Sequence, residues 1–175
     1  MRFLTVLLLA TAASAAFALP ASVEEFQARQ ATEATTAQGA AKLWFDAALV
    51  YETTDPILGA KLLTIMMKDK QWASSMPYLL DTLRLRPYVL RSYIKGATPE
   101  QAYAINADAY ELNVRDMSLQ PFTQFPEGKI VRLMVQSGGA ATPRFLDLER
   151  AGNGLYVVRN PGPLCVLIRP PSTQR

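Results

Sequence analysis

The sequence contains no histidine and only one cysteine, Cys165, among its 175 residues. A Ser-His-Asp triad and a Cys-His pair are excluded, because both need an imidazole as the base. A zinc site would have to form from carboxylates and at most one thiolate, which is not a usual ligand set for this metal. We therefore expect no metal site and no cofactor. Cys165 lies in the apolar run 164–169, which favours a buried free thiol.

A strong excess of charge of one sign is also missing. The chain has 18 basic and 15 acidic side chains, which gives a formal net charge of +3. Proteins that bind nucleic acids through the phosphate backbone present a dense basic surface. The near balance of charge therefore predicts no nucleic-acid partner.

Long hydrophobic runs are absent except at the N-terminus. There, Arg2 precedes the apolar run 3–10, and small residues follow up to Ala18 in an A-x-A arrangement. This order is typical of a secretory signal peptide, and the run is shorter than the ~20 residues that span a membrane. The sequence predicts a signal peptide at 1–18 and an exported, periplasmic or extracellular protein with no membrane span after cleavage. The alternative is an uncleaved anchor.

Removal of the signal peptide leaves about 157 residues, enough for one domain that buries roughly two-thirds of its surface. Residues 19–34 are rich in alanine and polar side chains, and we expect a frayed helix or a flexible lead-in there. The domain itself is expected to cover 35–171, as a single α+β unit, with a short tail at 172–175.

The first half of the domain has helical periodicity. Asp55 and Pro56 are typical of the first positions of a helix. Pro87 disfavours helical structure at the residue before it, and we expect extended or turn structure after it. Helices are predicted over three segments: 35–52, 53–72 and 75–84.

The second half alternates between apolar and polar residues, which is typical of half-buried antiparallel strands. Asn153 and Gly154 predict a two-residue type I′ hairpin turn. Because helices precede strands, we expect an α+β fold with N-terminal helices packed on a mostly antiparallel sheet of four to five strands. A cone-shaped arrangement resembling the nuclear-transport-factor-2-like superfamily is one way to build it. Strands are predicted at 110–116, 129–137, 144–150, 154–160 and 164–169.

The stretch RSYIKGATPE, residues 91–100, is the first candidate binding segment. If it is extended, Arg91, Tyr93 and Lys95 point to one side, where two cations and a phenol suit a phosphate, carboxylate or sulfate. The alternative is structural: an edge strand that Lys95 protects from further pairing, then a turn at Gly96 and a helix start.

The predicted sheet offers a second candidate surface, with Arg132 and Arg144 as candidate ligand-binding residues. Arg132 and Arg115 lie on the polar face with Asp147 and Glu149, and either arginine could be their cross-strand partner. The alternative is that the two carboxylates form a catalytic pair. Arg144 ends the glycine-rich stretch 136–144, whose backbone N–H groups could bind an anion. That stretch lacks a nucleotide-binding motif and a following helix, so a hairpin loop is the alternative.

One carboxylate is a candidate catalytic residue. Asp46 lies beside Trp44 and Phe45 in the first predicted helix, and in a cone-shaped pocket it could act as a general base. On the solvent side of the helix it would have no such role.

Three stretches are notable together: RSYIKGATPEQAY at 91–103, VQSGGAATPRFLDLER at 135–150 and LIRPP at 167–171. As a set they resemble an uncharacterised bacterial family of small exported domains of unknown function. The resemblance extends over roughly 35–171. It implies no activity, and it assigns no catalytic residue.

These features predict an exported binding or interaction domain rather than an enzyme. Its partner would be a small molecule, a glycan or another envelope protein. Two alternatives stay open: a cone-fold enzyme that uses carboxylate acid–base chemistry around Asp46, and a structural subunit of an envelope assembly.

Overall fold

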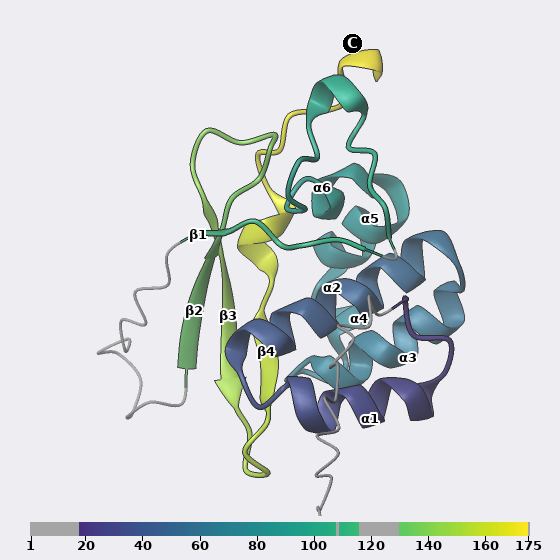
Figure 1. Ribbon diagram of the computed structural model, residues 1–175, viewed down its shortest axis with the longest axis vertical. Coiled ribbons are helices and arrows are strands. Elements are labelled where there is room, and N and C mark those ends of the chain that lie inside the picture. The colour runs from purple at the N-terminus through teal and green to yellow at the C-terminus, as the bar shows by residue number, and fades with distance from the viewer. Residues whose placement is uncertain (1–17, 108, 116–129, 175) are drawn as a thin grey trace, which may run out of the picture.

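A computed structural model describes residues 18–107, 109–115 and 130–174. The helices lie on one side of the molecule and the sheet on the other (Figure 1). Helices come first in the described chain and strands follow, so the protein is α+β, as predicted. The elements, with 3₁₀ helices written η, are α1 (Val23–Glu33), α2 (Ala37–Thr53), α3 (Pro56–Met66), α4 (Trp72–Ser75), α5 (Pro77–Leu85), α6 (Tyr88–Arg91), η1 (Pro99–Gln101), β1 (Val114–Arg115), β2 (Ile130–Val135), β3 (Arg144–Arg150), β4 (Tyr156–Asn160), η2 (Gly162–Cys165) and η3 (Ser172–Gln174).

Local capping explains where helices α2 and α3 begin. The Thr36 side chain caps α2 by accepting a hydrogen bond of 3.0 Å from the Gly39 N–H. Asp55 caps α3 by accepting from two backbone N–H groups, and Pro56 is the first helical residue, as predicted. The two helices then pack side by side.

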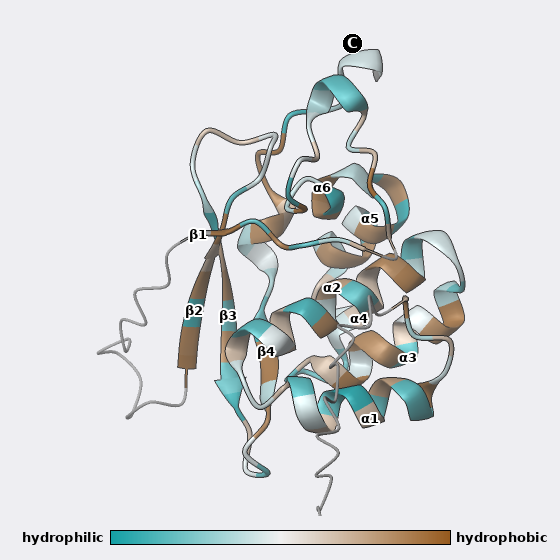
Figure 2. Ribbon diagram, in the orientation of Figure 1, coloured by the Kyte–Doolittle hydropathy of each residue, from teal (hydrophilic) through white to brown (hydrophobic). Residues whose placement is uncertain are grey.

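Residues 23–33 form helix α1, which is the helical one of the two predicted alternatives, and it packs on α2 and α3. Ser22 caps the helix by accepting a hydrogen bond of 3.1 Å from the Glu25 N–H. Most of the helix is polar (Figure 2), but Phe26 is fully buried and Arg29 forms an ion pair with Asp46 of α2. These two anchors depend on distant residues, so the alanine-rich composition did not reveal them.

The chain after Pro87 is helical, not extended or turn as predicted. Pro87 has helical dihedral angles and directly precedes α6. Its steric restriction falls on Arg86, where α5 ends, while its own fixed φ suits the start of the next helix. The residues that follow Pro87 therefore begin helix α6 and do not form a strand.

The sheet is antiparallel, with the order β1-β2-β3-β4, and consists of three longer strands and the two-residue strand β1 at one edge. β2 and β3 pair with Leu133 opposite Leu146 and Arg132 opposite Asp147. The predicted alternation is confirmed, because Leu133, Leu146 and Leu148 are fully buried, whereas Arg132 lies on the opposite face.

The turn between β3 and β4 differs from the predicted two-residue type I′ turn. The Ala151 N–H donates to the Leu155 carbonyl at 2.8 Å, and the Gly154 N–H donates to the Ala151 carbonyl at 2.9 Å. The loop thus has three residues, and its last one, Gly154, has a φ of +84°. A turn followed by one left-handed residue is a common three-residue hairpin, and here its central pair is Gly152 and Asn153.

The closing run 164–169 is not a strand. Its first residues belong to η2, and Leu167 has a left-handed φ of +56°. The prolines on either side of Gly162 remove two N–H donors that a strand would use. Cys165 is a buried free thiol, as predicted.

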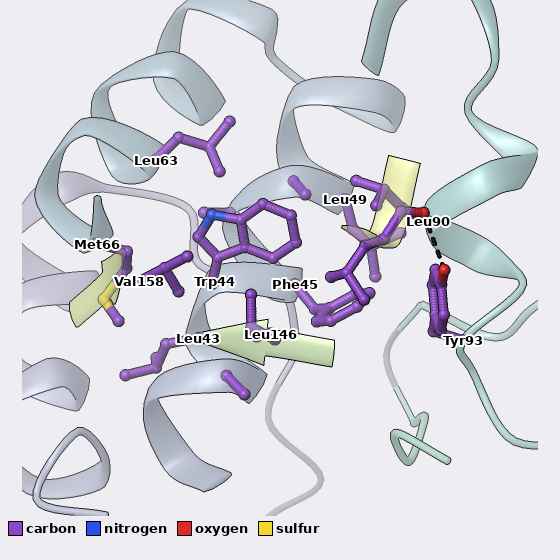
Figure 3. Packing of buried hydrophobic residues seen from close by; sticks show 14 of the residues in the cluster. Leu43, Trp44, Phe45, Leu49, Leu63, Met66, Leu90, Tyr93, Leu146 and Val158 are labelled. Atoms are coloured by element: carbon purple, nitrogen blue, oxygen red, sulfur yellow. Dashed lines mark hydrogen bonds between the residues drawn. The ribbon is translucent and has the colours of Figure 1, made fainter. Parts of the chain in front are cut away.

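Helix α2 forms the centre of the core. Trp44 and Phe45 are fully buried and meet edge to face, with ring centroids 5.2 Å apart. Figure 3 shows these rings among side chains from α3 and from the sheet, including Met66 and Leu146. None of the helices in the described segments is long and apolar enough to cross a membrane.

Three segments that are far apart in the sequence meet near the C-terminal end of the domain. Ser92 and Ser137 are buried, and their hydroxyl oxygens are hydrogen-bonded at 2.7 Å. The Gly138 N–H donates to the Ser92 carbonyl at 2.8 Å. We call this region the junction, and it comprises residues 92–103, 137–139 and 167–169.

Close packing in the junction depends on Gly139. The Tyr103 hydroxyl donates to the Arg169 carbonyl at 2.6 Å, and the Arg169 N–H donates to the Gly139 carbonyl at 2.9 Å. A Cβ on Gly139 would lie 2.0 Å from the Tyr103 hydroxyl oxygen. The Tyr103 ring is stacked on Tyr88, with centroids 5.8 Å apart, so it has little freedom to move away.

Replacing Gly139 with alanine is expected to lower the free energy of unfolding by about 1–3 kcal/mol, because the added methyl group displaces the Tyr103 hydroxyl. Gly152→Ala is the matched control, since nothing lies within 4 Å of its added Cβ. Urea denaturation of both variants and the parent protein measures the difference. Equal midpoints for the two variants would show that the junction accommodates the extra methyl group.

Candidate binding groove

A surface groove of about 410 Å³ lies between residues 94–96 on one side and residues 104–106 and 109–111 on the other. This volume is within the range of small-molecule sites, roughly 300–1,000 Å³. The walls combine polar and apolar side chains from both segments. Its lining includes Ile94, Lys95, Ile105, Asn106, Tyr110 and Glu111.

A tight turn forms one wall of the groove. The Ala97 N–H donates to the Ile94 carbonyl at 3.1 Å, and Gly96 has a φ of +85°. A positive φ at the third position is what a type II turn requires, so the turn predicted at Gly96 is confirmed. The Lys95 N–H also donates to the Glu111 carbonyl at 2.9 Å, which ties the two walls together through their backbones.

Tyr110, in the other wall, is held by charged groups beneath it. Its hydroxyl donates to Asp46 Oδ1 at 2.7 Å, and Lys42 Nζ lies 3.8 Å from the centroid of its ring. Burial, followed by the negative charge of Asp46, raises the pKa of Tyr110 well above its usual value of 10. The phenol therefore stays protonated and keeps donating to Asp46, which presents Tyr110 to the groove in one orientation.

Asp46 is the centre of a buried ionic cluster, and only 1% of it is exposed. Oδ1 accepts from Lys42 Nζ at 2.6 Å as well as from Tyr110, and Oδ2 accepts from Arg29 Nη2 at 2.7 Å. Arg29 also pairs with Glu33 at 2.7 Å. Burial alone would lower the pKa of Arg29, but the hydrogen bond to Glu33 and the charge of Asp46 raise it overall. Both Asp46 oxygens are engaged by donors, which suits holding elements together better than removing a substrate proton.

The structure separates the three residues predicted to form an anion-binding face. Arg91 Nε pairs with Glu52 Oε2 at 3.2 Å. Tyr93 is fully buried, its hydroxyl donates to a backbone carbonyl at 2.9 Å (Figure 3), and burial raises its pKa. Lys95 is exposed at the groove. The predicted common face is wrong, because side chains two residues apart share a face only in an extended chain.

Arg132 and Arg144, the other two predicted ligand-binding residues, contact groups of their own chain. Arg132 donates to both Asp147 oxygens, at 2.6 and 2.9 Å, and its guanidinium carbon lies 3.6 Å from the centroid of the Phe145 ring. Arg144 donates to Thr142 Oγ1 at 2.7 Å and to the Leu167 carbonyl at 3.5 Å. Arg144 thereby holds the closing segment against the start of β3.

The two sheet carboxylates, considered as a catalytic pair, are also ion-paired. Glu149 contacts Lys68 and lies 2.9 Å from Arg159 Nη1, while Asp147 is held by Arg132. Across the residues that the structure describes, no three acidic or thiol side chains come together in a way that could hold a metal ion.

Sequence reasoning missed Glu52, near the end of α2. Its side chain is fully buried, and its Oε1 accepts no hydrogen bond within the described residues. Burial raises the pKa of Glu52 to about 8, although the positive charge of Arg91 opposes the shift. The available signal was spacing, since Glu52 follows the apolar Phe45 by seven residues and so falls on the same helix face.

The chain belongs to the family defined by a domain of unknown function, DUF6935, whose model matches residues 18–172. The prediction of an uncharacterised family is confirmed, while its bacterial and exported character stays a prediction. The match includes α1, so this helix is part of the family domain. Neither a curated protein nor a solved structure matches the chain.

Removing the Asp46 carboxylate is expected to destabilise the domain strongly. Asp46→Ala leaves Arg29 and Lys42 without their shared counter-charge, and breaking a buried pair in this way typically costs about 3–5 kcal/mol. Asp81→Ala, at an exposed position of α5, should change the free energy of unfolding by less than about 0.5 kcal/mol. Urea denaturation at pH 7 compares the two variants, and similar small losses for both would contradict a central role for Asp46.

Glu52 is expected to make the protein less stable as the pH rises. Its pKa is near 4.5 in the unfolded chain and about 8 when folded, so in this window the folded state binds more protons. The free energy of unfolding then falls by up to about 1.4 kcal/mol per pH unit. Glu52→Gln should remove this slope and stabilise the protein at pH 8.5, whereas Glu111→Gln, whose side chain is 76% exposed, should not. If the free energy of unfolding changed with pH in the same way in Glu52→Gln and in the parent, a raised pKa of Glu52 would be contradicted.

Proposed function

We propose that the protein is an exported domain that binds a small polar molecule in the groove beside Tyr110. The observation that carries this proposal is a groove of about 410 Å³ whose wall contains a side chain fixed from below by buried charges. Binding sites work best when their lining groups are already oriented, since less order is lost on binding. Export is supported by the N-terminal pattern of Arg2, an apolar run and an A-x-A site.

The chemistry of the walls favours a ligand with both hydroxyl groups and apolar surface, such as a saccharide. Lys95 supplies a donor, Glu111 an acceptor and Asn106 an amide, while Ile94 and Ile105 supply apolar contacts. The side chains of Lys95 and Glu111 pair at 3.1 Å but are 70% and 76% exposed. Exposed ion pairs contribute little, at most about 1 kcal/mol, so a ligand can replace this contact at small cost.

A cone-fold enzyme around Asp46 is the rival function. It would need the carboxylate in an open pocket with one oxygen available to a substrate. Lys42, Tyr110 and Arg29 already donate to its oxygens, which favours a positioning role for Asp46 and a binding role for the protein.

A structural subunit is the third possibility, and it would need a large continuous apolar surface. In the described part of the chain, the most exposed large apolar side chains come from separate elements: Ile57 of α3, Leu85 of α5 and Leu167 of the closing segment. Three side chains from three elements are a weaker sign of an assembly surface than a continuous apolar face on one element would be.

Native mass spectrometry of the mature protein, released gently from its own cell envelope, tests the proposal. The parent is compared with Ala104→Trp, which fills the groove from an exposed lining position. Ala141→Trp is the matched control, exposed and outside the groove lining. We expect a small-mass adduct on the parent and on Ala141→Trp, and its loss from Ala104→Trp.

Each other result has a definite meaning. An adduct retained by Ala104→Trp would place the ligand outside the groove. A larger complex with another protein would support the assembly subunit. If all three proteins had the mass of the polypeptide alone, the proposal of a tightly bound ligand would be contradicted.

A further inference from the structure

Glu52 and Arg91 form a pair in which the acid is buried and the base is partly exposed. The Glu52 side chain is fully buried, whereas 28% of the Arg91 side chain is exposed. A single hydrogen bond of 3.2 Å joins them, from Arg91 Nε to Glu52 Oε2. Oε1 of Glu52, as stated above, accepts no hydrogen bond from any described residue. The pair is therefore incompletely satisfied on the acid side.

The end of the Arg91 guanidinium group is not used by this pair. Glu52 engages Nε, and among the described residues no hydrogen bond is made by Nη1 or Nη2. These two nitrogens form a planar fork that fits two oxygens of a carboxylate, phosphate or sulfate group. Glu52 engages Nε, so Nη1 and Nη2 are the guanidinium nitrogens left for a ligand, and 28% of the Arg91 side chain is exposed.

Arg91 also lacks a full counter-charge at neutral pH. Burial raises the pKa of Glu52 to about 8, so most of its carboxyl groups are protonated at pH 7. Among the described residues, Arg91 is the charged group that lowers the pKa of Glu52. An arginine fixed by a largely neutral acid carries positive charge that an incoming anion can neutralise.

We propose that Arg91 binds a small anion through its terminal nitrogens and that Glu52 takes up a proton as the anion binds. The anion brings negative charge close to Glu52, which disfavours the ionised carboxylate there. Protonation of Glu52 in turn leaves the charge of Arg91 to the anion. The proton comes from solvent and stays on Glu52, and the two events strengthen each other by linkage.

This site differs from the groove in the residues that it uses. Lys95 and Tyr110 take no part in it, so the test of the anion site does not depend on whether the groove binds a ligand. Its ligand class is a carboxylate, phosphate or sulfate, recognised by the guanidinium fork of a pair whose net charge depends on pH through Glu52.

NMR titration of the full mature protein measures the affinity directly. Sodium sulfate is the first probe, because its charge does not change between pH 6.5 and 9.5, and succinate tests carboxylates. At constant ionic strength we expect the Kd for sulfate to rise at least tenfold over this pH range. The slope of log Kd against pH, near its maximum around the Glu52 transition, gives the number of protons taken up, which should approach one.

Four variants separate the anion site from a merely structural pair. Glu52→Gln should bind sulfate with an affinity that no longer depends on pH. Arg91→Gln should weaken binding at least tenfold at pH 6.5, and Arg91→Lys, which keeps the charge but loses the fork, should weaken it less and still take up a proton. Lys61→Gln, at an exposed position of α3, is the control for general positive charge and should bind like the parent.

Three results would overturn the proposal. The first is an Arg91→Gln variant that binds sulfate with the same Kd as the parent. The second is a Glu52→Gln variant whose Kd follows pH as in the parent. The third is a parent protein that binds neither sulfate nor succinate at tens of millimolar. If Arg91→Gln does not fold, Arg91→Lys takes its place in the test, because it keeps the positive charge and removes only the fork.

Discussion

The domain depends on one buried carboxylate, Asp46. It joins α1, through Arg29, to α2 and to the segment that carries Tyr110. A buried ion cluster adds little net stability, because desolvation offsets most of the attraction. Its effect is selective, because only this docking of α1 pairs Arg29 with Asp46 in addition to Glu33 of its own helix. In the same place Asp46 accepts a hydrogen bond from the Tyr110 hydroxyl. The same carboxylate therefore sets the first helix and one wall of the groove.

Elements whose signals are local could be predicted from the sequence. Asp55 and Pro56 begin α3, and the alternation of β2 and β3 follows from a period of two residues. Helix α1 could not be placed in this way, because its anchors Phe26 and Arg29 find their partners in the folded core. The closing run 164–169 has strand-like composition, but the neighbouring prolines and the hold of Arg144 decide its path.

The candidate site was predictable in residue type but, apart from the predicted cross-strand pair of Arg132 with Asp147, not in partnership. Sequence reasoning selected charged residues, but the partner of each one is decided by tertiary contacts between distant segments. Arg132 meets Asp147 across two strands, whereas Arg91 reaches back to Glu52 at the end of α2. The sequence places Tyr110 only at the start of a predicted strand, because nothing local indicates that Asp46 contacts it.

The single thiol has a chemical consequence for a protein proposed to work in an oxidising compartment. Burial raises the pKa of Cys165 to about 11. At pH 7 roughly one molecule in ten thousand then carries the thiolate, which is the form that attacks disulfides. With 3% of the residue exposed, oxidants and other chains have little access to the sulfur. Both features disfavour a disulfide between two copies of the domain, and they favour a thiol that stays reduced without a reducing partner.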